Sequence, residues 1–298
     1  MQALYELPAP AKLNLFLHVV GRREDGYHLL QSLFVLIDWC DTLHVERRSD
    51  GRLQRHDLGP ALPADDLCLR AAHALQRASG TSLGADLSIH KQVPWGAGLG
   101  GGSSDAATTL LALNRLWGLD WPRARLLALA APLGADVPFF VGGRHALVEG
   151  IGERLTPVEL PTRVYAVLKP PAAIETRAVF SDPGLRRDGR ADILSGSLED
   201  AQRLPDEALG LMDGYGRNDL QPVAERLCPE VAEAARWLEA RHGNSRMTGS
   251  GSAVFARVAR AGMADHSLAT GPAPETAPGW VGRTCRSLPQ HPLWGWAD

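Results

Sequence analysis

A glycine run at residues 94–107 is the feature that most constrains this chain, because it joins a strand-like segment directly to a helix-like one. It reads Pro-Trp-Gly-Ala-Gly-Leu-Gly-Gly-Gly-Ser-Ser-Asp-Ala-Ala. Glycines let backbone N–H groups approach an anion closely, and the N-terminus of a helix adds partial positive charge. Ser103 and Ser104 add hydroxyls where phosphate oxygens or a metal ion would lie. The segment therefore predicts a phosphate-binding loop.

A dinucleotide-binding fingerprint, a Walker A loop and a simple helix cap are the other interpretations of this glycine run. The spacing Gly96-x-Gly98-x-x-Gly101 satisfies the dinucleotide-binding fingerprint, but that fingerprint needs a second parallel strand after the helix, and a second helix is expected here. A Walker A loop is excluded because no Lys-Ser or Lys-Thr closes the glycine run. A glycine-rich turn in which Ser or Asp only caps a helix stays open.

Composition and charge narrow the class of protein. The 298 residues are 45% hydrophobic and 22% charged, which is typical of an ordinary globular chain of one large or two moderate domains. The formal net charge of -3 shows no excess of the basic residues on which sequence-independent nucleic-acid binding depends, so we expect no nucleic-acid partner. The four cysteines are far apart and show no metal-ligand spacing, which indicates reduced thiols in a cytoplasmic protein.

We also expect no membrane association. The first twenty residues lack a basic leader, and Glu6, Pro8 and Pro10 interrupt any signal-peptide core. No run of eighteen apolar residues is present, so a spanning helix is not predicted.

Alternation of leucines with other side chains predicts a strand at residues 12–20. Lys12 and Asn14 are expected to share the face opposite Leu13 and Leu17. Further strands are predicted at 33–39, 42–47, 86–91, 144–149, 164–168 and 253–258. Helices are predicted at 66–79, 104–116, 122–131, 176–180 and 229–241, and a surface loop at 269–279.

With these segments in view, the chain resembles the GHMP kinases. Pro94, followed by Gly-Leu-Gly, further glycines, Ser-Ser and Ala-Ala, is similar to the central motif of that family. The match continues, in the family's order, through PAKLNLF at 10–16, GYH at 26–28, GADVPFF at 134–140, EGIGE at 149–153 and MTGSGSAVF at 247–255.

The resemblance implies an α+β fold of two domains with the substrate in the cleft between them. Residues 1–160 would form an N-terminal ribosomal-protein-S5-like domain that holds the phosphate loop. Residues 161–298 would form a C-terminal ferredoxin-like α/β sandwich.

The resemblance also implies a catalytic pair, Asp136 and Lys12. A carboxylate in a short turn after Gly134 could accept the proton of an attacking hydroxyl. Lys12 would keep Asp136 ionised and offset the charge that develops as phosphate transfers. Taken alone, an Asp before Val-Pro is as easily a turn or cap residue, and Lys12 a solvated strand lysine.

The implied acceptor is the 2-hydroxyl of 4-diphosphocytidyl-2-C-methyl-D-erythritol, in the non-mevalonate route to isopentenyl diphosphate. Tyr27 would stack on the cytosine ring, His28 would read its polar edge, and Phe180 would close the other side. Thr176 would lie on the same helix face as Phe180, and Asn14 would contact the methylerythritol end. Without the family, these aromatics are ordinary packing residues.

The implied phosphate donor is ATP, with Mg²⁺ to neutralise the transferring phosphates. The residues expected at ATP are Asp66, Pro94, Gly96, Ala97, Gly98, Leu99, Gly100, Gly101, Gly102, Ser103 and Ser104. The family usually has Asn at the position of Asp66, and an ionised Asp cannot donate the same hydrogen bond to adenine. Ser104 or Asp105 would contact the metal, although Asp105 could equally be an early helix residue.

Two alternatives remain, namely a GHMP kinase for another small alcohol and a non-catalytic nucleotide-binding relative. The partner expected is a small-molecule substrate, and the expected assembly is a monomer or a weak homodimer.

Overall fold

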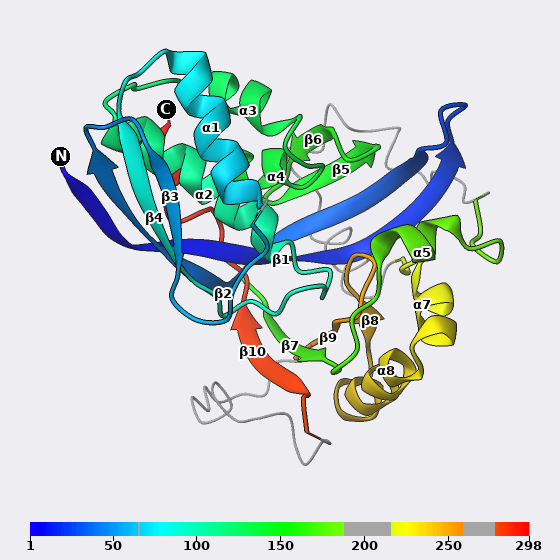
Figure 1. Ribbon diagram of the computed structural model, residues 1–298. Coiled ribbons are helices and arrows are strands. Elements are labelled where there is room, and N and C mark those ends of the chain that lie inside the picture. Colours follow the sequence, from blue (N-terminus) through cyan, green and yellow to red (C-terminus); the bar gives the residue numbers. More distant parts are fainter. Residues whose placement is uncertain (65, 188–215, 259–277, 298) are drawn as a thin grey trace.

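A long hairpin runs through both halves of the molecule in the computed structural model, which describes residues 1–64, 66–187, 216–258 and 278–297 (Figure 1). Its strands are β1 (Ala3–Arg22) and β2 (His28–Arg48), paired antiparallel. Both strands belong to the first sheet. Further along, Leu17 forms a bridge with Asn218 of the second half, so the hairpin connects the two halves.

The first half is a six-stranded sheet covered by helices on one face (Figure 1). The strand order is β3-β4-β2-β5-β6, with β1 also paired to β2. The remaining strands are β3 (Leu53–Asp57), β4 (Gly84–His90), β5 (Ala146–Gly150) and β6 (Arg154–Pro157). The helices are α1 (Leu67–Ser79), α2 (Gly101–Leu116), α3 (Arg123–Ala130) and α4 (Val137–Gly142). Helix α2 is buried on almost all sides, and its apolar residues pack in the first hydrophobic cluster with the other helices and the sheet of the first half.

The second half is a four-stranded antiparallel sheet in the order β10-β7-β9-β8, packed against helices. The strands are β7 (Val164–Lys169), β8 (Arg246–Met247), β9 (Val254–Arg257) and β10 (Val281–Arg286). The helices are α5 (Thr176–Ser181), α7 (Gln221–Leu227) and α8 (Pro229–His242). The short 3-10 helix η3 (Trp294–Trp296) lies against α2 of the first half. This mixed helix and sheet architecture confirms the expected α+β class.

The sequence prediction was wrong in one respect about β2. Two strands were expected at 33–39 and 42–47, but the structure has one continuous strand. Pro10 pairs with Cys40 and Ala11 with Ile37, so residues 38 and 39 form a bulge within the strand. A bulge takes up extra residues without ending the ladder, so the strand continues through Cys40 and Asp41, where the prediction had placed a break.

The predicted alternation in β1 holds for Lys12 and Asn14 but fails at Leu17. The pairing register shifts between Asn14 and Leu17. Phe16 consequently joins Leu13 in one hydrophobic cluster, whereas Leu17 belongs to another and lines the cleft described below. Side chains alternate between the two faces of a strand only while the register is regular, so the shift breaks the alternation.

The last strand of the first sheet, β6, ends at Pro157, and the next strand, β7, begins the second sheet at Val164. The boundary expected near residue 160 lies between these two positions. The C-terminal residues nevertheless return to the first half, where the backbone N–H of His291 donates to Gly143 O (2.8 Å). The loop predicted at 269–279 lies outside the described residues up to position 277.

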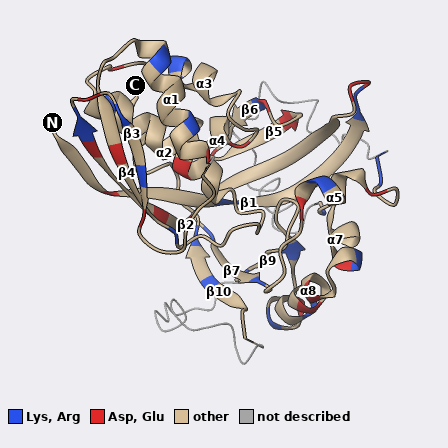
Figure 2. Ribbon diagram, viewed as in Figure 1, with Lys and Arg blue, Asp and Glu red and all other residues tan. Residues whose placement is uncertain are grey.

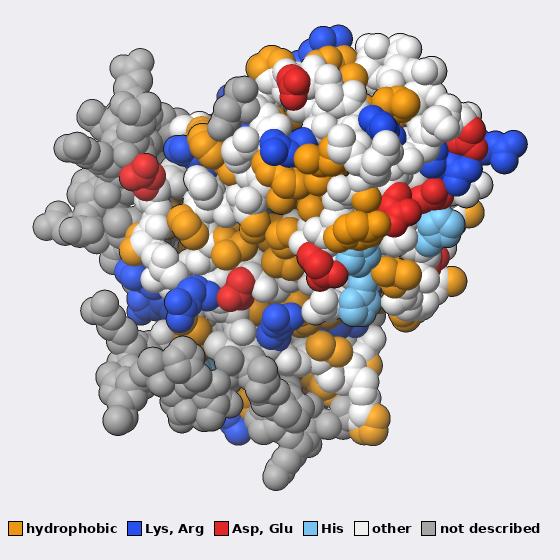
Figure 3. Space-filling view, turned by 90° about the vertical axis from the view of Figure 1, so that its left-hand side faces the viewer, with side chains coloured by type: hydrophobic (Ala, Val, Ile, Leu, Met, Phe, Trp, Pro, Cys, Tyr) orange, Lys and Arg blue, Asp and Glu red, His pale blue; other side chains and the backbone are white. Residues whose placement is uncertain are grey.

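Charged side chains of both signs are spread over both halves (Figure 2). On the face seen in Figure 3, hydrophobic side chains gather in the middle, with basic and acidic side chains interspersed around them. Within the described residues, no helix is both long and apolar enough to cross a membrane.

Candidate active site

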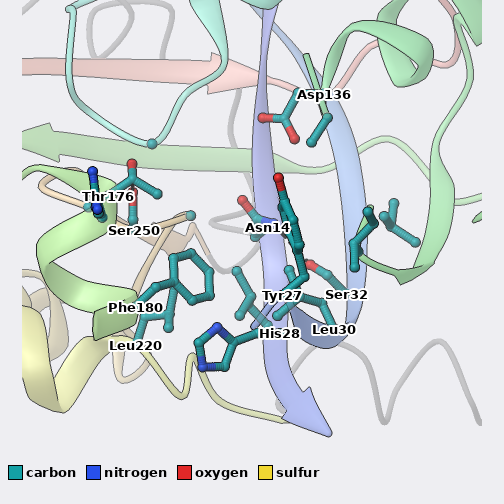
Figure 4. A pocket seen from close by; sticks show the side chains of 18 of the residues that line it. Asn14, Tyr27, His28, Leu30, Ser32, Asp136, Thr176, Phe180, Leu220 and Ser250 are labelled. Carbon is teal, nitrogen blue, oxygen red and sulfur yellow. Dashed lines mark hydrogen bonds between the residues drawn. The ribbon is translucent and has the colours of Figure 1, made fainter. Parts of the chain in front are cut away.

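A cleft of about 1010 Å³ lies where the two halves meet. It is lined by the hairpin, the phosphate loop, the start of α4, helix α5 and the loop at 249–251. Figure 4 shows Asp136 reaching in from one side, Thr176, Phe180 and Ser250 from another, and Asn14, Tyr27 and His28 from the hairpin. The cleft thus brings together residues that are far apart in sequence.

The phosphate loop is tied to both halves by its backbone. The N–H of Lys12 donates to Leu99 O (2.9 Å), and the N–H of Ala253 donates to Ala97 O (3.1 Å). Gly98 has a φ of 73°, and a Cβ there would lie only 2.1 Å from Thr248 O. Only glycine fits this position, because both the left-handed backbone and the close approach of residue 248 exclude a side chain.

The loop residues predicted to bind ATP divide into two groups. Those that line the cleft are Gly96, Gly98, Gly100 and Ser103. The structure does not place Pro94, Ala97, Leu99, Gly101, Gly102 or Ser104 among the described residues lining it. The side chain of Ser104 is fully buried, so Ser103 presents the hydroxyl that faces the cleft.

Asp66 lies at the N-cap of α1 and away from the cleft wall. Its Oδ1 accepts the N–H of Leu69 (2.9 Å), and its carboxylate also pairs with Arg55. These contacts occupy the side chain, and a role for Asp66 at adenine stays a prediction.

The proposed catalytic pair forms at the first strand and the start of α4. Lys12 Nζ lies 3.6 Å from Asp136 Oδ2 and donates to Asn14 Oδ1 (2.5 Å). Burial lowers the pKa of Lys12, and Asp136 partly opposes that effect. The ammonium also lies 4.6 Å from the centroid of the Phe34 ring. Lys12 is therefore a buried lysine and not a solvated one.

Asp136 occupies the N-cap position of α4, yet its side chain makes no capping hydrogen bond. Its carboxylate is 30% exposed and faces the cleft. The alternative of a simple cap residue loses its support, because a capping Asp would accept a backbone N–H of the first turn.

Asn14 is held from two sides. Its Nδ2 donates to Ser32 Oγ (2.9 Å), and its backbone N–H donates to Thr248 Oγ1 (3.0 Å). Ser32 Oγ in turn donates to Phe16 O (2.5 Å). Asn14 is thereby fixed beside Lys12 with little freedom to turn.

The other end of the cleft carries the residues predicted for cytosine. Tyr27 is 61% exposed at the hairpin turn. The rings of His28 and Phe180 lie 5.2 Å apart between centroids at an interplanar angle of 34°. Thr176 Oγ1 and Ser250 Oγ are 2.7 Å apart. All of these residues line the cleft, and Thr176 and Phe180 share α5 as expected.

Sequence reasoning missed three arginines that line the cleft, Arg22, Arg177 and Arg187. Arg187 Nε donates to His28 Nε2 (3.2 Å), which leaves the proton of a neutral imidazole on Nδ1. Burial lowers the pKa of His28, and the charges of Arg187 and Arg22 lower it further. Arg22 and Arg187 each belong to an Arg-Arg pair, at 22–23 and 186–187, but such a pair alone does not show that it lines a cleft.

A metal ion would find few protein ligands in this cleft. Across the described ranges, no group of three or more His, Cys, Asp or Glu could hold one. Mg²⁺ needs only one or two protein oxygens when substrate phosphates supply the rest, and the hydroxyl of Ser103 faces the cleft. The donor set fits a nucleotide-bound ion of this kind. The Oγ of Ser104 is buried without a partner in the described part of the chain, and its metal role stays a prediction.

Family models match both halves of the chain. The GHMP kinases N terminal domain matches residues 66–144, and the GHMP kinases C terminal model matches residues 196–266. The solved structure of a 4-(cytidine 5'-diphospho)-2C-methyl-D-erythritol kinase is 37% identical with a TM-score of 0.73, covering 94% of this chain and 98% of that chain. A homoserine kinase from Cytophaga hutchinsonii, 16% identical with a TM-score of 0.66, shares the fold over 98% of this chain and 96% of its own.

Sequence relatives match over the full length. A protein of Methylibium petroleiphilum named 4-diphosphocytidyl-2-C-methyl-D-erythritol kinase is 61% identical over 100% of this chain and 99% of its own. A protein of the same name from Variovorax paradoxus is 57% identical over 100% of both chains.

Proposed function

The chain belongs to the GHMP kinases, and within them to the 4-diphosphocytidyl-2-C-methyl-D-erythritol kinases, and we propose that its cleft transfers a phosphoryl group from ATP to the 2-hydroxyl of that compound. It is an ATP-using kinase with a small-molecule substrate. The roles of single residues, the magnesium ion and a cytoplasmic location are part of the proposal.

One observation carries the catalytic assignment. Asp136 has a carboxylate that makes no capping hydrogen bond, faces the cleft and lies beside the buried ammonium of Lys12. The glycines and Ser103 of the phosphate loop line the same cleft. A base, a cation and a phosphate cradle therefore share one cavity, which is what transfer to an alcohol requires.

In the proposed mechanism, Asp136 accepts the proton of the acceptor hydroxyl as the new O–P bond forms. Lys12 keeps Asp136 ionised and offsets charge on the transferring group. Because Lys12 also donates to Asn14, its ammonium is held in place before substrate arrives. Lys12 and Asn14 together orient the acceptor.

The phosphate loop would hold ATP through its backbone N–H groups at the start of α2. Magnesium bound with the nucleotide would supply positive charge to the phosphates, and Ser103 is the cleft hydroxyl that would contact it. Kinase catalysis depends mainly on this positioning, so the fixed backbone of the loop is part of the catalytic apparatus.

The cytidyl group would bind at the hairpin end, stacked between Tyr27 and Phe180, with His28 at the edge of the base. The neutral His28 ring offers Nδ1–H as a donor, because Arg187 already donates to Nε2. A cytosine ring presents acceptors on its Watson–Crick edge, which suits such a donor. Arg22 and Arg187 add positive charge near a diphosphate.

The test is ADP release by the purified protein with ATP and magnesium. 4-Diphosphocytidyl-2-C-methyl-D-erythritol is compared with methylerythritol phosphate, mevalonate and homoserine in parallel. Turnover with the cytidyl compound alone is expected. Turnover with another alcohol would keep the phosphate loop and discard the cytosine site, and ATP binding without turnover would indicate a nucleotide-binding relative.

A further inference from the structure

The C-terminal segment, residues 287–297, leaves the second sheet after β10 and returns to the helices of the first half (Figure 1). On the way, the N–H of Leu288 donates to Leu36 O of β2 (2.9 Å). Leu293 and Ala297 are 6% and 3% exposed and belong to the same hydrophobic cluster as α4. No residue of this segment lines the cleft, so the proposed chemistry does not use it directly.

The C-terminal segment packs on the residue that ends α4. The N–H of His291 donates to the carbonyl oxygen of Gly143 (2.8 Å), which is the C-cap of that helix. A Cβ added on Gly143 would lie 2.8 Å from Trp294 Cδ1 and 3.2 Å from His291 Cβ. The end of α4 and the segment are therefore in direct contact.

Arg123, the first residue of α3, joins the two. Its guanidinium donates both to Val141 O within α4 and to Trp294 O in the C-terminal segment. The centroid of the Trp294 ring lies 5.0 Å from Arg123 Cζ and 4.7 Å from Arg144 Cζ. The backbone N–H of Arg123 also donates to Ala297 O (2.7 Å). Because a guanidinium presents its donors in a rigid plane, Arg123 holds two carbonyl groups at a fixed separation.

The opposite end of α4 carries Asp136. The Asp136 side chain makes no capping hydrogen bond, so the place of its carboxylate follows from the place of the helix. One side of α4 is held by Phe139, whose ring meets Phe34 edge to face at 5.2 Å, and the Lys12 ammonium lies over the same Phe34 ring. Six helical residues span only about 9 Å as a rigid unit. A shift at Gly143 is therefore transmitted to Asp136.

We propose that Trp294 and Arg123 are positioning residues for Asp136, because they hold the C-terminal end of α4 and thereby set the distance of the carboxylate from Lys12 and from the acceptor hydroxyl. This inference rests on the proposed role of Asp136 as the base. Neither positioning residue lines the cleft. A displacement of reacting groups by about 1 Å can cost about 100-fold in rate, so loosening α4 should slow phosphoryl transfer more than it weakens binding.

Trp294→Ala removes the ring that packs on the end of α4. The rate of phosphoryl transfer in a single turnover should fall by about 10- to 100-fold. The KM values for ATP and for the cytidyl substrate should change by less than about threefold, because the binding groups stay in place. Single-turnover kinetics are used because slow product release can hide a change in the chemical step. Trp294→Phe keeps an aromatic face for the two guanidiniums and should recover most of the rate.

Trp296→Ala is the matched control. Trp296 lies in the same 3-10 helix and is partly buried like Trp294, but its ring centroid is 5.1 Å from Cζ of Arg115, in the last turn of α2 and away from the phosphate loop. Its loss should lower the midpoint of thermal unfolding and leave the single-turnover rate close to that of wild type.

Arg123→Lys tests the other half of the arrangement. Lysine keeps the positive charge but lacks the planar fork that donates to both carbonyl groups. Its single-turnover rate should fall, and adding Trp294→Ala should lower it by less than the product of the two separate effects, because both residues act through one contact. Arg125→Lys is the control, since Arg125 is exposed in the same helix and lies over the Trp121 ring.

The decisive experiment repeats Trp294→Ala in the Asp136→Asn background. If the C-terminal segment acts through the carboxylate, its loosening should change the residual rate of Asp136→Asn by less than about twofold. A merely structural role would lower the rate by the same factor in both backgrounds. The comparison is made well below the unfolding temperature of every variant.

Equal losses of rate in Trp294→Ala and Trp296→Ala would overturn the positioning role, and so would the same factor for Trp294→Ala in both backgrounds. Either result is compatible with normal turnover of the cytidyl compound by wild type, so it would leave the proposed function intact. Absence of turnover by wild type would instead contradict the proposed function and, with it, the positioning role.

Discussion

The two ends of the cleft are built in different ways. At the phosphate end, Lys12 is 3% exposed, Asn14 is 1% exposed, and the loop is tied by backbone hydrogen bonds to both halves of the protein. At the cytidyl end, Tyr27 is 61% exposed on a hairpin turn and faces the six-residue helix α5. The first end is fixed by the fold, whereas the second depends on exposed side chains.

This difference has a kinetic consequence. Groups held rigidly in the core act on the transition state, and their loss should lower kcat or abolish ATP binding. Exposed groups that hold the distant part of the substrate should mainly change KM. Variants at the two ends of the cleft test whether effects on kcat or ATP binding separate from effects on KM for the cytidyl substrate, and the largest effect is expected at Asp136.

Asp136→Asn should lower kcat by about 10³-fold, within the range expected for loss of a general base. The amide keeps the shape of the carboxylate but cannot accept the proton. Steady-state ADP release measures the effect, while calorimetry should show ATP and substrate still bound and thermal unfolding should be nearly unchanged. A kcat close to wild type would remove Asp136 from the chemistry.

Gly98→Ala should raise the KM for ATP by about 100-fold or prevent binding altogether, because the new methyl group meets Thr248 O at a left-handed backbone position. Gly102→Ala is the matched control, because no atom lies within 4 Å of a Cβ added at Gly102, which lies in the first turn of α2. Alanine there should leave the fold intact or stabilise the helix slightly. Similar ATP affinities in the two variants would show that the loop is not tightly fixed.

Much of the phosphate end could be predicted from sequence because its signals are local. The glycine run announces a loop before a helix, and alternation in β1 places Lys12 beside Asn14. The alternation failed at Leu17, where a register shift that no local pattern revealed turns the chain. Helix α4 was missed because its residues, Val137–Gly142, show no alternation of apolar and polar side chains at helical spacing.

The ion pair of Lys91 with Asp41 and the cytidyl end could be predicted less well, because they depend on contacts between distant segments. Asp41 and Lys91 are fifty positions apart and meet only because β2 pairs with β4. Arg187 reaches His28 across 159 positions. Tyr27 and Phe180 were identified through family resemblance, since an exposed aromatic residue has no distinctive local pattern.

Tyr27→Ala should raise the KM for the cytidyl substrate by roughly 5- to 150-fold, as expected for loss of about 1–3 kcal/mol of base stacking. The kcat should change little, because Tyr27 is an exposed side chain and is not part of the pair formed by Lys12 and Asp136. Tyr5→Ala is a suitable control, as Tyr5 is similarly exposed at 58% but does not line the cleft. An equal KM in both variants would make Tyr27 a surface residue without a part in recognition.

Arg187→Gln should have the smallest effect, seen as a shift in a pH profile. Arg187 helps to lower the pKa of His28, so its removal should move that pKa upward toward 6.5. Burial and Arg22 still lower the pKa in the variant, but its His28 should become protonated at a higher pH than in wild type. A protonated ring donates from both nitrogens and no longer presents an acceptor. The KM for the cytidyl substrate should therefore rise at pH 6 by about threefold more in the variant than in wild type.

Arg186→Gln is the matched control for this shift, because Arg186 is the exposed neighbour of Arg187 and does not line the cleft. Its KM profile should superimpose on that of wild type. NMR titration of the His28 ring measures the pKa directly and separates a change in protonation from a change in packing. If the His28 pKa is the same in Arg187→Gln and wild type, the cytidyl end is not tuned by charge, and recognition there rests on ring contacts alone.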